Sequence, residues 1–128
     1  MSTDPMKAVV AFLRSLSDLP SGSVKGDMAD REVGSTTVYV EHNGGFRLVR
    51  DCMDRIDVVY EVYDLDREKA AELAFLVREH FLESAPNSVS GDLFFLDTLE
   101  ISMPDYEPDA TSREHVYCGE VSLFYVEN

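Results

Sequence analysis

Hydrophobic and polar residues follow two successive periods between Arg55 and Leu82. The first part alternates every second residue, as expected for a half-buried β-strand; its apolar positions are Ile56, Val58, Tyr60 and Val62. The second part repeats as one face of a helix; its apolar positions are Ala70, Leu73, Ala74, Val77 and Phe81. Asp66 suits the helix N-cap and Glu68 suits the positive end of the helix dipole. The pattern predicts a buried strand that leads directly into a long amphipathic helix.

A second helix is predicted near the start of the sequence. Asp4 is a favourable N-cap and Pro5 suits the first helical position. An apolar stripe at helical spacing follows; it comprises Met6, Val9, Val10, Leu13 and Leu16. The helix should end near Ser17, since turn-forming residues follow. A membrane-surface helix would carry more than the two basic residues found here, so we expect this stripe to pack on the core.

Strand-like segments account for most of the remaining sequence. They are Val24 to Met28, Thr36 to Glu41, Phe46 to Met53, Leu93 to Met103 and Glu114 to Val126. In the last of them, one face is the more uniformly apolar and should meet the core; it carries Tyr117, Gly119, Val121, Leu123 and Tyr125. His42 to Gly45 reads as a tight hairpin turn, because Asn-Gly and Gly-Gly readily adopt positive φ. The segments Ser84 to Ser88 and Pro104 to Ser112 read as loops.

The order of these segments predicts an α+β fold in one domain that spans residues 1–128. We expect a single mainly antiparallel sheet of about four to five strands, with two helices packed on one face. A chain of 128 residues is long enough to bury a core of its own.

The net charge of −14 narrows the possible functions. Binding to nucleic acid or to anionic membranes requires clustered Lys and Arg, which this composition does not favour. No apolar run is long enough for a membrane-spanning helix, and the first residues lack the pattern of a signal peptide. We therefore expect a cytoplasmic product without membrane partners.

The chemically reactive side chains form no recognisable site. Cys52 and Cys118 lie in apolar, strand-like contexts and are expected to be buried, reduced thiols, with a disulfide as the alternative. The three histidines are isolated and show no metal-ligand spacing; they are His42, His80 and His115. No nucleophile motif is present. We expect no enzyme activity, no catalytic residue, no metal and no cofactor.

Two segments have an alternative chemical interpretation. Asp105, Glu107 and Asp109 could bind a hard cation, but the spacing of a Ca²⁺ loop is missing, and a solvated acidic loop is favoured. Asn43-Gly44-Gly45 could be taken for a phosphate cradle, but such a loop should lead into a helix. Here the glycines lie between two strand patterns, so the hairpin is favoured.

The ordered set of segments resembles the tail terminator proteins of long-tailed bacteriophages, especially those of actinobacterial hosts. The resemblance is carried by the strand and turn in TTVYVEHNGG, by the strand-to-helix step in DVVYEVYDLDREKAAELAFLVREHFL, and by the loop in PDYEPDATSREHVY. Within these segments the shared positions are Val38, Val40, Gly44, Gly45, Ala70, Leu73, Ala74, Val77, Arg78, Pro108, Asp109 and Arg113. The chain departs from the family in the segment before Thr36, where members often have a Pro-Arg-Pro-like approach.

This resemblance implies a structural virion protein that caps the tail tube as a hexameric ring. Its implied partners are further copies of itself, the major tail tube protein and a head-completion or connector protein, with DNA passing through the ring without specific binding. The implied location is the head-proximal end of the tail, after assembly in the host cytoplasm. Because loops on a rigid scaffold often carry binding, we expect two loops to serve as assembly surfaces. Their residues are Asn43, Gly44, Gly45, Asp105, Tyr106, Glu107, Asp109 and Arg113.

Three other functions remain open on the sequence. The nearest is another head–tail connector or tail-completion protein. A second is an acidic inhibitor that mimics DNA, although Arg67, Lys69 and Arg78 interrupt the acids of the long helix. A small α+β enzyme is the third, and it would require a convergent pocket of histidines and acids that the spacing does not suggest.

Overall fold

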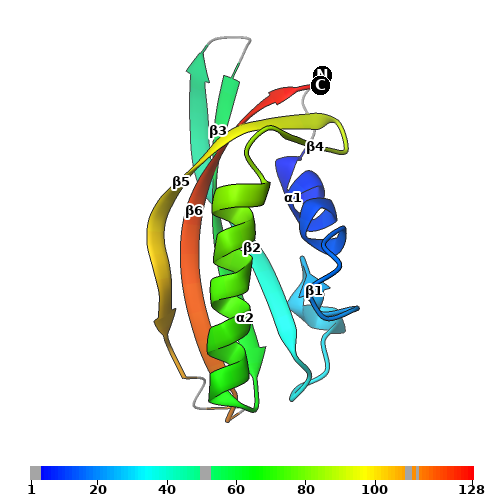
Figure 1. Cartoon of the computed structure of the whole chain (residues 1–128), viewed down its shortest axis with the longest axis vertical. Coiled ribbons are helices and arrows are strands. Elements are labelled where there is room, and N and C mark those ends of the chain that lie inside the picture. The colour runs from blue at the N-terminus through cyan, green and yellow to red at the C-terminus, as the bar shows by residue number, and fades with distance from the viewer. Residues whose placement is uncertain (1–3, 50–52, 109–110, 112) are drawn as a thin grey trace.

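The computed structural model describes residues 4–49, 53–108, 111 and 113–128. Two α-helices, a short 3-10 turn, a π-helical turn and six strands follow one another along the chain (Figure 1). They are α1 (Pro5–Arg14), β1 (Val24–Lys25), η1 (Met28–Asp30), β2 (Thr37–Val49), β3 (Met53–Asp64), α2 (Arg67–Glu79), η2 (His80–Ser84), β4 (Ser88–Ser90), β5 (Leu93–Tyr106) and β6 (His115–Glu127).

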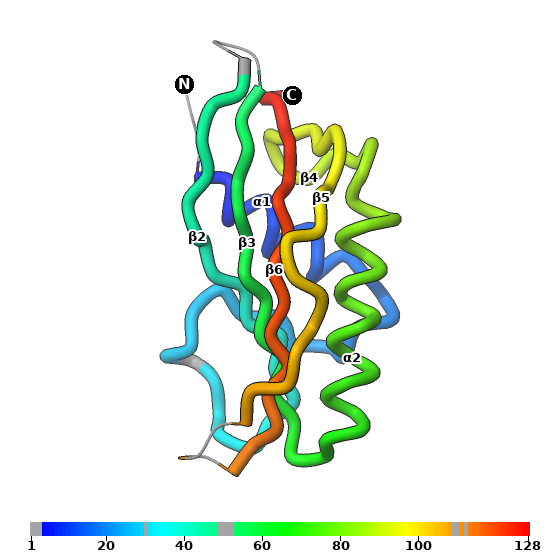
Figure 2. Tube along the Cα trace, turned by 90° about the vertical axis from the view of Figure 1, so that its left-hand side faces the viewer, coloured from blue at the N-terminus to red at the C-terminus, as the bar shows by residue number. Residues whose placement is uncertain are grey.

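The strands form one mixed sheet in the order β1-β2-β3-β6-β5-β4. β1 and β2 run parallel, whereas every other neighbouring pair is antiparallel. The sheet curls as a half-barrel, and both helices lie on the same face of it (Figures 1 and 2). The predicted α+β class is confirmed, but the sheet has six strands and not the expected four to five. The structure adds the three-residue strand β4, of which only Ser88 falls in the predicted loop Ser84 to Ser88. The predicted strand Thr36 to Glu41 and the start of the predicted strand Phe46 to Met53 lie in one strand, β2.

The core fills the space between the two helices and the sheet. β3 buries every second residue, and the helix-facing side chains of β6 are buried beside them. The predicted core face of α2 is confirmed, since Ala70, Leu73, Ala74 and Val77 are buried and Phe81 in η2 continues the stripe. The rings of Phe12 and Phe81 lie 6.3 Å apart, and those of Tyr60 and Phe81 lie 5.5 Å apart, so both helices meet the sheet through aromatic contacts.

Both helices begin as their N-terminal residues predict. The Asp4 carboxylate accepts a hydrogen bond from the Met6 N–H at 3.0 Å, with Pro5 in the first helical turn. The Asp66 carboxylate accepts from Glu68 N–H at 3.0 Å. α1 is shorter than predicted and ends at Arg14, whose guanidinium donates to the Val24 carbonyl at 3.1 and 3.2 Å and thereby ties α1 to β1.

The predicted hairpin turn at Asn43-Gly44-Gly45 is wrong. These residues lie inside β2, which continues from Thr37 to Val49 with a bulge in its pairing with β3 between His42 and Gly45. Both glycines have positive φ, at 84° for Gly44 and 138° for Gly45. A bulge uses such conformations as readily as a turn does. Gly45 is also required sterically, because a Cβ there would lie 2.0 Å from the Arg55 carbonyl oxygen.

The predicted loop from Pro104 to Ser112 is also partly wrong. Pro104, Asp105 and Tyr106 belong to β5, and Asp105 and Tyr106 are paired with Cys118 and Tyr117 of β6. Pro104 is tolerated because the β5–β6 register shifts between Ser102 and Asp105.

Candidate assembly surfaces

The two groups of predicted assembly residues lie in different parts of the molecule. Asn43, Gly44 and Gly45 occupy the bulge of β2, next to one edge of the sheet. The second group lies at the lower end of the molecule in Figure 2, where β5 passes into β6. Asp105, Tyr106, Glu107 and Arg113 belong to it, whereas Asp109 lies outside the described residues. The structure therefore offers two separate surfaces.

Asn43 uses the bulge to reach across the helix-free face of the sheet. Its side-chain amide donates to the Glu120 carboxylate of β6 at 2.8 Å, past the intervening strand β3. The ring of His42 makes a contact of 3.1 Å between Nε2 and the Gly44 carbonyl oxygen. The bulge thus aims an exposed amide over the sheet, which a two-residue hairpin turn would not do.

Tyr106 is held within an aromatic and cationic cluster at the β5–β6 end. Its hydroxyl lies 2.7 Å from His115 Nδ1, and its ring centroid lies 5.3 Å from that of Tyr117. Arg67, from the first turn of α2, covers the Tyr106 ring with its guanidinium carbon 3.9 Å from the centroid. These contacts order the strand ends, and the exposed members of this group are Asp105, Glu107 and Arg113.

A buried ion pair fixes the segment that precedes β2. Arg31 forms a bidentate pair with Glu114, and their side chains are 6% and 0% exposed. Arg31 also donates to Thr37 Oγ1 at 2.9 Å, and Glu114 accepts from the Gly34 N–H at 3.2 Å. No local sequence pattern links these two residues, which are 83 positions apart.

The helix-free face of the sheet combines one ion pair with a group of acids. Arg55 binds Asp57 at 2.8 Å, and Ser122 donates to the same carboxylate at 2.6 Å. Burial raises the pKa of Asp57, but these hydrogen bonds outweigh it and hold the pKa below the usual value. Burial together with the nearby Glu41 raises the pKa of Glu61, which means that its charged form is disfavoured. A cationic group beside Glu61 would stabilise that charged form.

Cys118 lies among these acids with a half-buried, free thiol, and Cys52 lies outside the described residues. Burial, reinforced by Glu61 and Glu107, raises the pKa of the Cys118 thiol to about 11. The thiol is therefore protonated near neutral pH and is a poor nucleophile.

One hydrogen-bonded chain has the composition of a catalytic triad. His80 Nε2 lies 2.8 Å from an Asp18 carboxylate oxygen, and His80 Nδ1 lies 2.9 Å from Ser84 Oγ. The Asp18 side chain is 52% exposed, however, and Ser84 lies one turn beyond His80 on the exposed surface of η2. A working triad needs a sheltered carboxylate and donors placed for an oxyanion. The chain instead ties the end of α2 to the α1–β1 connection.

Within the residues that the structure describes, no group of three or more histidine, cysteine, aspartate or glutamate side chains is arranged to hold a metal ion. In the same part of the chain, no helix has the length and apolar character needed to cross a membrane.

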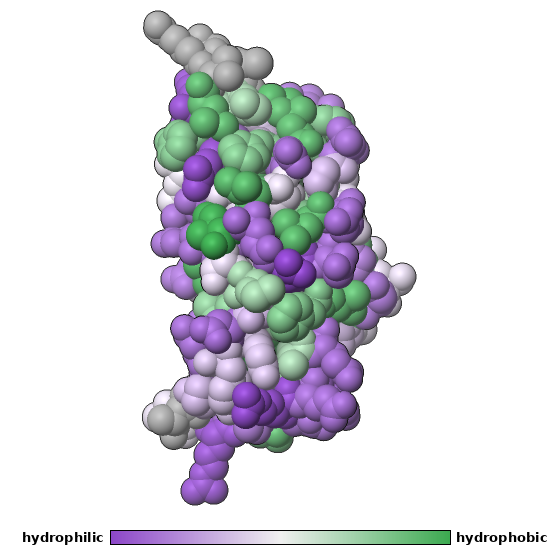
Figure 3. Space-filling view, turned by 60° about the vertical axis from the view of Figure 1, so that its left-hand side comes forward, coloured by the Kyte–Doolittle hydropathy of each residue, from purple (hydrophilic) through white to green (hydrophobic). Residues whose placement is uncertain are grey.

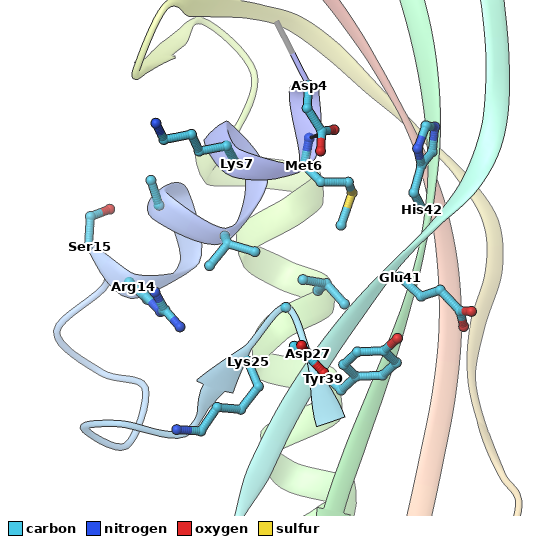
Figure 4. A pocket seen from close by; sticks show the side chains of 14 residues that line it. Asp4, Met6, Lys7, Arg14, Ser15, Lys25, Asp27, Tyr39, Glu41 and His42 are labelled. Atoms are coloured by element: carbon cyan, nitrogen blue, oxygen red, sulfur yellow. Dashed lines mark hydrogen bonds between the residues drawn. The ribbon is translucent and has the colours of Figure 1, made fainter. Parts of the chain in front are cut away.

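A groove lies between α1 and the free edge of β2 (Figure 4). It encloses about 960 Å³. Met6 extends from α1 toward β2, while Lys7 and Lys25 point away from β2 at the rim of the groove. The groove opens where β1 ends, because β1 pairs with β2 only at Val38 and Tyr39.

Large hydrophobic side chains are exposed mainly along the two outer long strands. On the side of the molecule seen in Figure 3, they gather in the upper and middle parts, between hydrophilic side chains. Nine such residues are exposed among those described, and five of them belong to β2 or β5. These five are Phe46, Leu48, Leu99, Ile101 and Met103.

A search of the sequence against protein-family models and a search of curated proteins both find no match.

Proposed function

We propose that this protein is a tail terminator of long-tailed bacteriophages, a structural subunit that assembles into a ring on the tail tube. The observation that carries the proposal is the exposure of Phe46, Leu48, Leu99, Ile101 and Met103 along both outer long strands. Large apolar side chains that are exposed together along sheet edges are typical of a surface that another chain covers.

The choice of a tail terminator rests on the resemblance of the ordered segments, from TTVYVEHNGG to PDYEPDATSREHVY. The charge is compatible with this role. Copies that each carry −14 would present DNA with a repelling surface, so that DNA could pass without sticking. The ring caps the tube, ends its polymerisation and offers its other side to a head-completion protein.

The test is capping of growing tail tubes. The major tail tube protein is polymerised with and without the purified protein, and tube lengths are measured by electron microscopy. We expect shorter tubes with the added protein at one end, and a ring in light scattering at high protein concentration and moderate salt. A monomer under those conditions, together with unchanged tube lengths, would refute the proposal.

Two alternatives predict different outcomes of the same experiments. Another head–tail connector would bind the head-completion protein but leave tube growth unchanged. An acidic DNA mimic would bind a nucleic-acid-binding protein and compete with DNA. The gene position offers an independent check, because a tail terminator gene is expected between head-completion genes and the major tail protein gene.

A further inference from the structure

Both outer long strands have a free edge. β2 is paired on its outer side only at Val38 and Tyr39, by β1. β5 is paired on its outer side only from Leu93 to Phe95, by β4. Beyond these short stretches, neither strand has an outer partner among the described residues. Unpaired N–H and C=O groups along a strand edge are a template for another strand.

The two free edges have the directions required for pairing with each other. Three antiparallel pairs separate β2 from β5 in the sheet, so β2 and β5 run in opposite directions. A second copy, rotated about an axis roughly along the strands, would bring its β5 beside β2 of the first copy as an antiparallel neighbour. Such an interface is heterologous, and it forms a ring when the rotation between neighbouring copies closes.

Charged residues lie beside both edges. α1 and β1, which flank the β2 edge, carry Lys7, Arg14 and Lys25, and the groove is also lined by the acids Asp4, Asp27 and Glu41. The Asp4 and Asp27 carboxylates accept hydrogen bonds from the backbone N–H groups of Met6 and Ala29. Among the described residues, no carboxylate forms an ion pair with Lys7 or Lys25. β5 carries the acids Asp97, Glu100 and Asp105 and no basic residue. Arg78 of α2 already binds Glu100, so Asp97 is the acid of the Asp97–Glu100 stretch that can meet a lysine of another copy.

The groove beside α1 provides room for the incoming strand. It begins where β1 stops, and it is lined by Met6 and Val10 of α1 and by Val40 to His42 of β2. Bulges interrupt both edge strands, between His42 and Gly45 in β2 and on either side of Asp97 to Glu100 in β5. Because bulges oppose extended edge pairing, the regular stretches between them set a short, defined contact.

We propose that β5 of one copy pairs antiparallel with β2 of the next copy, with the Asp97–Glu100 stretch seated in the groove between α1 and β2. The inference rests on the proposed ring and names the surface that builds it. Leu99 is covered by the neighbouring copy, and Asp97 meets the basic rim formed by Lys7 and Lys25.

Charge reversal tests the pairing. Lys25→Glu and Asp97→Lys are each expected to weaken self-association about tenfold or more, because each places like charges across the interface. The double variant should restore association, and so should an equimolar mixture of the two single variants. In that mixture an alternating ring has only complementary contacts. Association is measured by sedimentation velocity at one fixed salt concentration, and on tail tubes by co-pelleting.

A second substitution tests the apolar contact. Leu99→Lys should abolish association, whereas Val33→Lys is the matched control, because Val33 is similarly apolar and exposed but lies in the loop before β2. Circular dichroism and thermal melting establish that each variant is folded before its association is measured.

The outcomes separate the two proposals. If the wild-type protein neither self-associates nor caps tubes, the tail terminator proposal fails and the pairing fails with it. If the wild type forms rings and Lys25→Glu, Asp97→Lys and Leu99→Lys form them equally well, only the edge pairing is overturned. Loss of association in one charge variant without rescue by the double variant also overturns it, since the two residues then do not face each other.

Discussion

Gly119 of β6 lies opposite Tyr60 of β3, and the Tyr60 ring occupies the space that a side chain at position 119 would fill. A Cβ at position 119 would lie 2.4 Å from both the Cζ atom and the hydroxyl oxygen of Tyr60. Tyr60 is fully buried and packs on Phe81 of η2, so it has little freedom to move aside. This pair sets how closely α2 and η2 approach the sheet.

Gly119→Ala should therefore destabilise the fold by about 2 to 3 kcal/mol, the range for overpacking a tight core. Urea unfolding with a two-state fit measures the change. In a double-mutant cycle, Tyr60→Leu should remove most of the penalty of Gly119→Ala, because the smaller leucine leaves room for a Cβ at position 119. Additive losses in the cycle would contradict the contact.

Tyr60→Phe should leave stability unchanged or raise it by about 1 kcal/mol. The Tyr60 hydroxyl is buried, and no described residue is its hydrogen-bond partner. Removing an unsatisfied polar group costs nothing and recovers its desolvation free energy. The Phe variant keeps the ring that contacts Phe81. A loss of more than 1 kcal/mol in urea unfolding would show that the hydroxyl is satisfied in solution.

Glu114→Ala should cost about 3 to 5 kcal/mol, because it leaves the Arg31 guanidinium charged in a nearly closed site. Arg31→Met combined with Glu114→Leu should recover most of that loss, since both charges are then absent from the site. Thermal unfolding of the three proteins measures the difference. If the double variant is no better than Glu114→Ala, a further role of Arg31, such as its position over the Tyr63 ring, carries the stability.

The Asp57 ion pair predicts a loss of stability in acid. The folded-state pKa of Asp57 is lowered, so the stabilisation is complete above the unfolded pKa and is lost as pH falls through the folded value. The loss should begin below about pH 4, the unfolded pKa of an aspartate. Asp57→Asn should cost about 1 to 2 kcal/mol at neutral pH and flatten this part of the profile. An unchanged profile would exclude the ion pair as its source.

Glu61 provides a control of opposite sign. Its folded-state pKa is raised, because burial and neighbouring acids disfavour the charged form. Its ionised form therefore weakens the fold above the unfolded pKa, and Glu61→Gln should be more stable than the wild type at neutral pH. The two variants should thus shift stability in opposite directions in the same buffer.

Assembly should become stronger as salt rises from low to moderate concentration. Each copy carries −14, and screening reduces the repulsion between copies, which acts over distances comparable with the Debye length. Ion pairs across the interface act at short range and are screened less. Light scattering over a salt series measures this effect. A steady weakening with salt would mean that attraction between surface charges dominates assembly.

The helix–sheet core could be predicted from sequence because its signals are local. The Ala70–Phe81 stripe and the alternation in β3 both repeat over short windows, and the structure buries them as expected. The glycines in Asn43-Gly44-Gly45 are also a local feature of the sequence, but they predict only that the backbone has positive φ there. A turn and a bulge both need that conformation, and the pairing of Gly45 with Ile56 selects the bulge.

The remaining features depend on contacts between distant positions. Arg31 and Glu114 form a buried ion pair although they are 83 positions apart in the sequence. The sequence around either residue gives no indication of the other. The sequence pattern predicts Tyr106 on a loop, whereas Arg67 and His115 hold it at the end of β5. The free edges of β2 and β5 follow from strand order, which a single sequence does not reveal.

Placing both helices on one face of the sheet leaves the opposite face without a covering layer (Figure 2). Side chains such as Val58 and Tyr60 are constrained by α2, and most changes there would damage the core. Val59 and Glu120 are paired on the opposite face of the sheet, away from both helices. Related proteins can therefore acquire different partners through that face while the same interior maintains the fold.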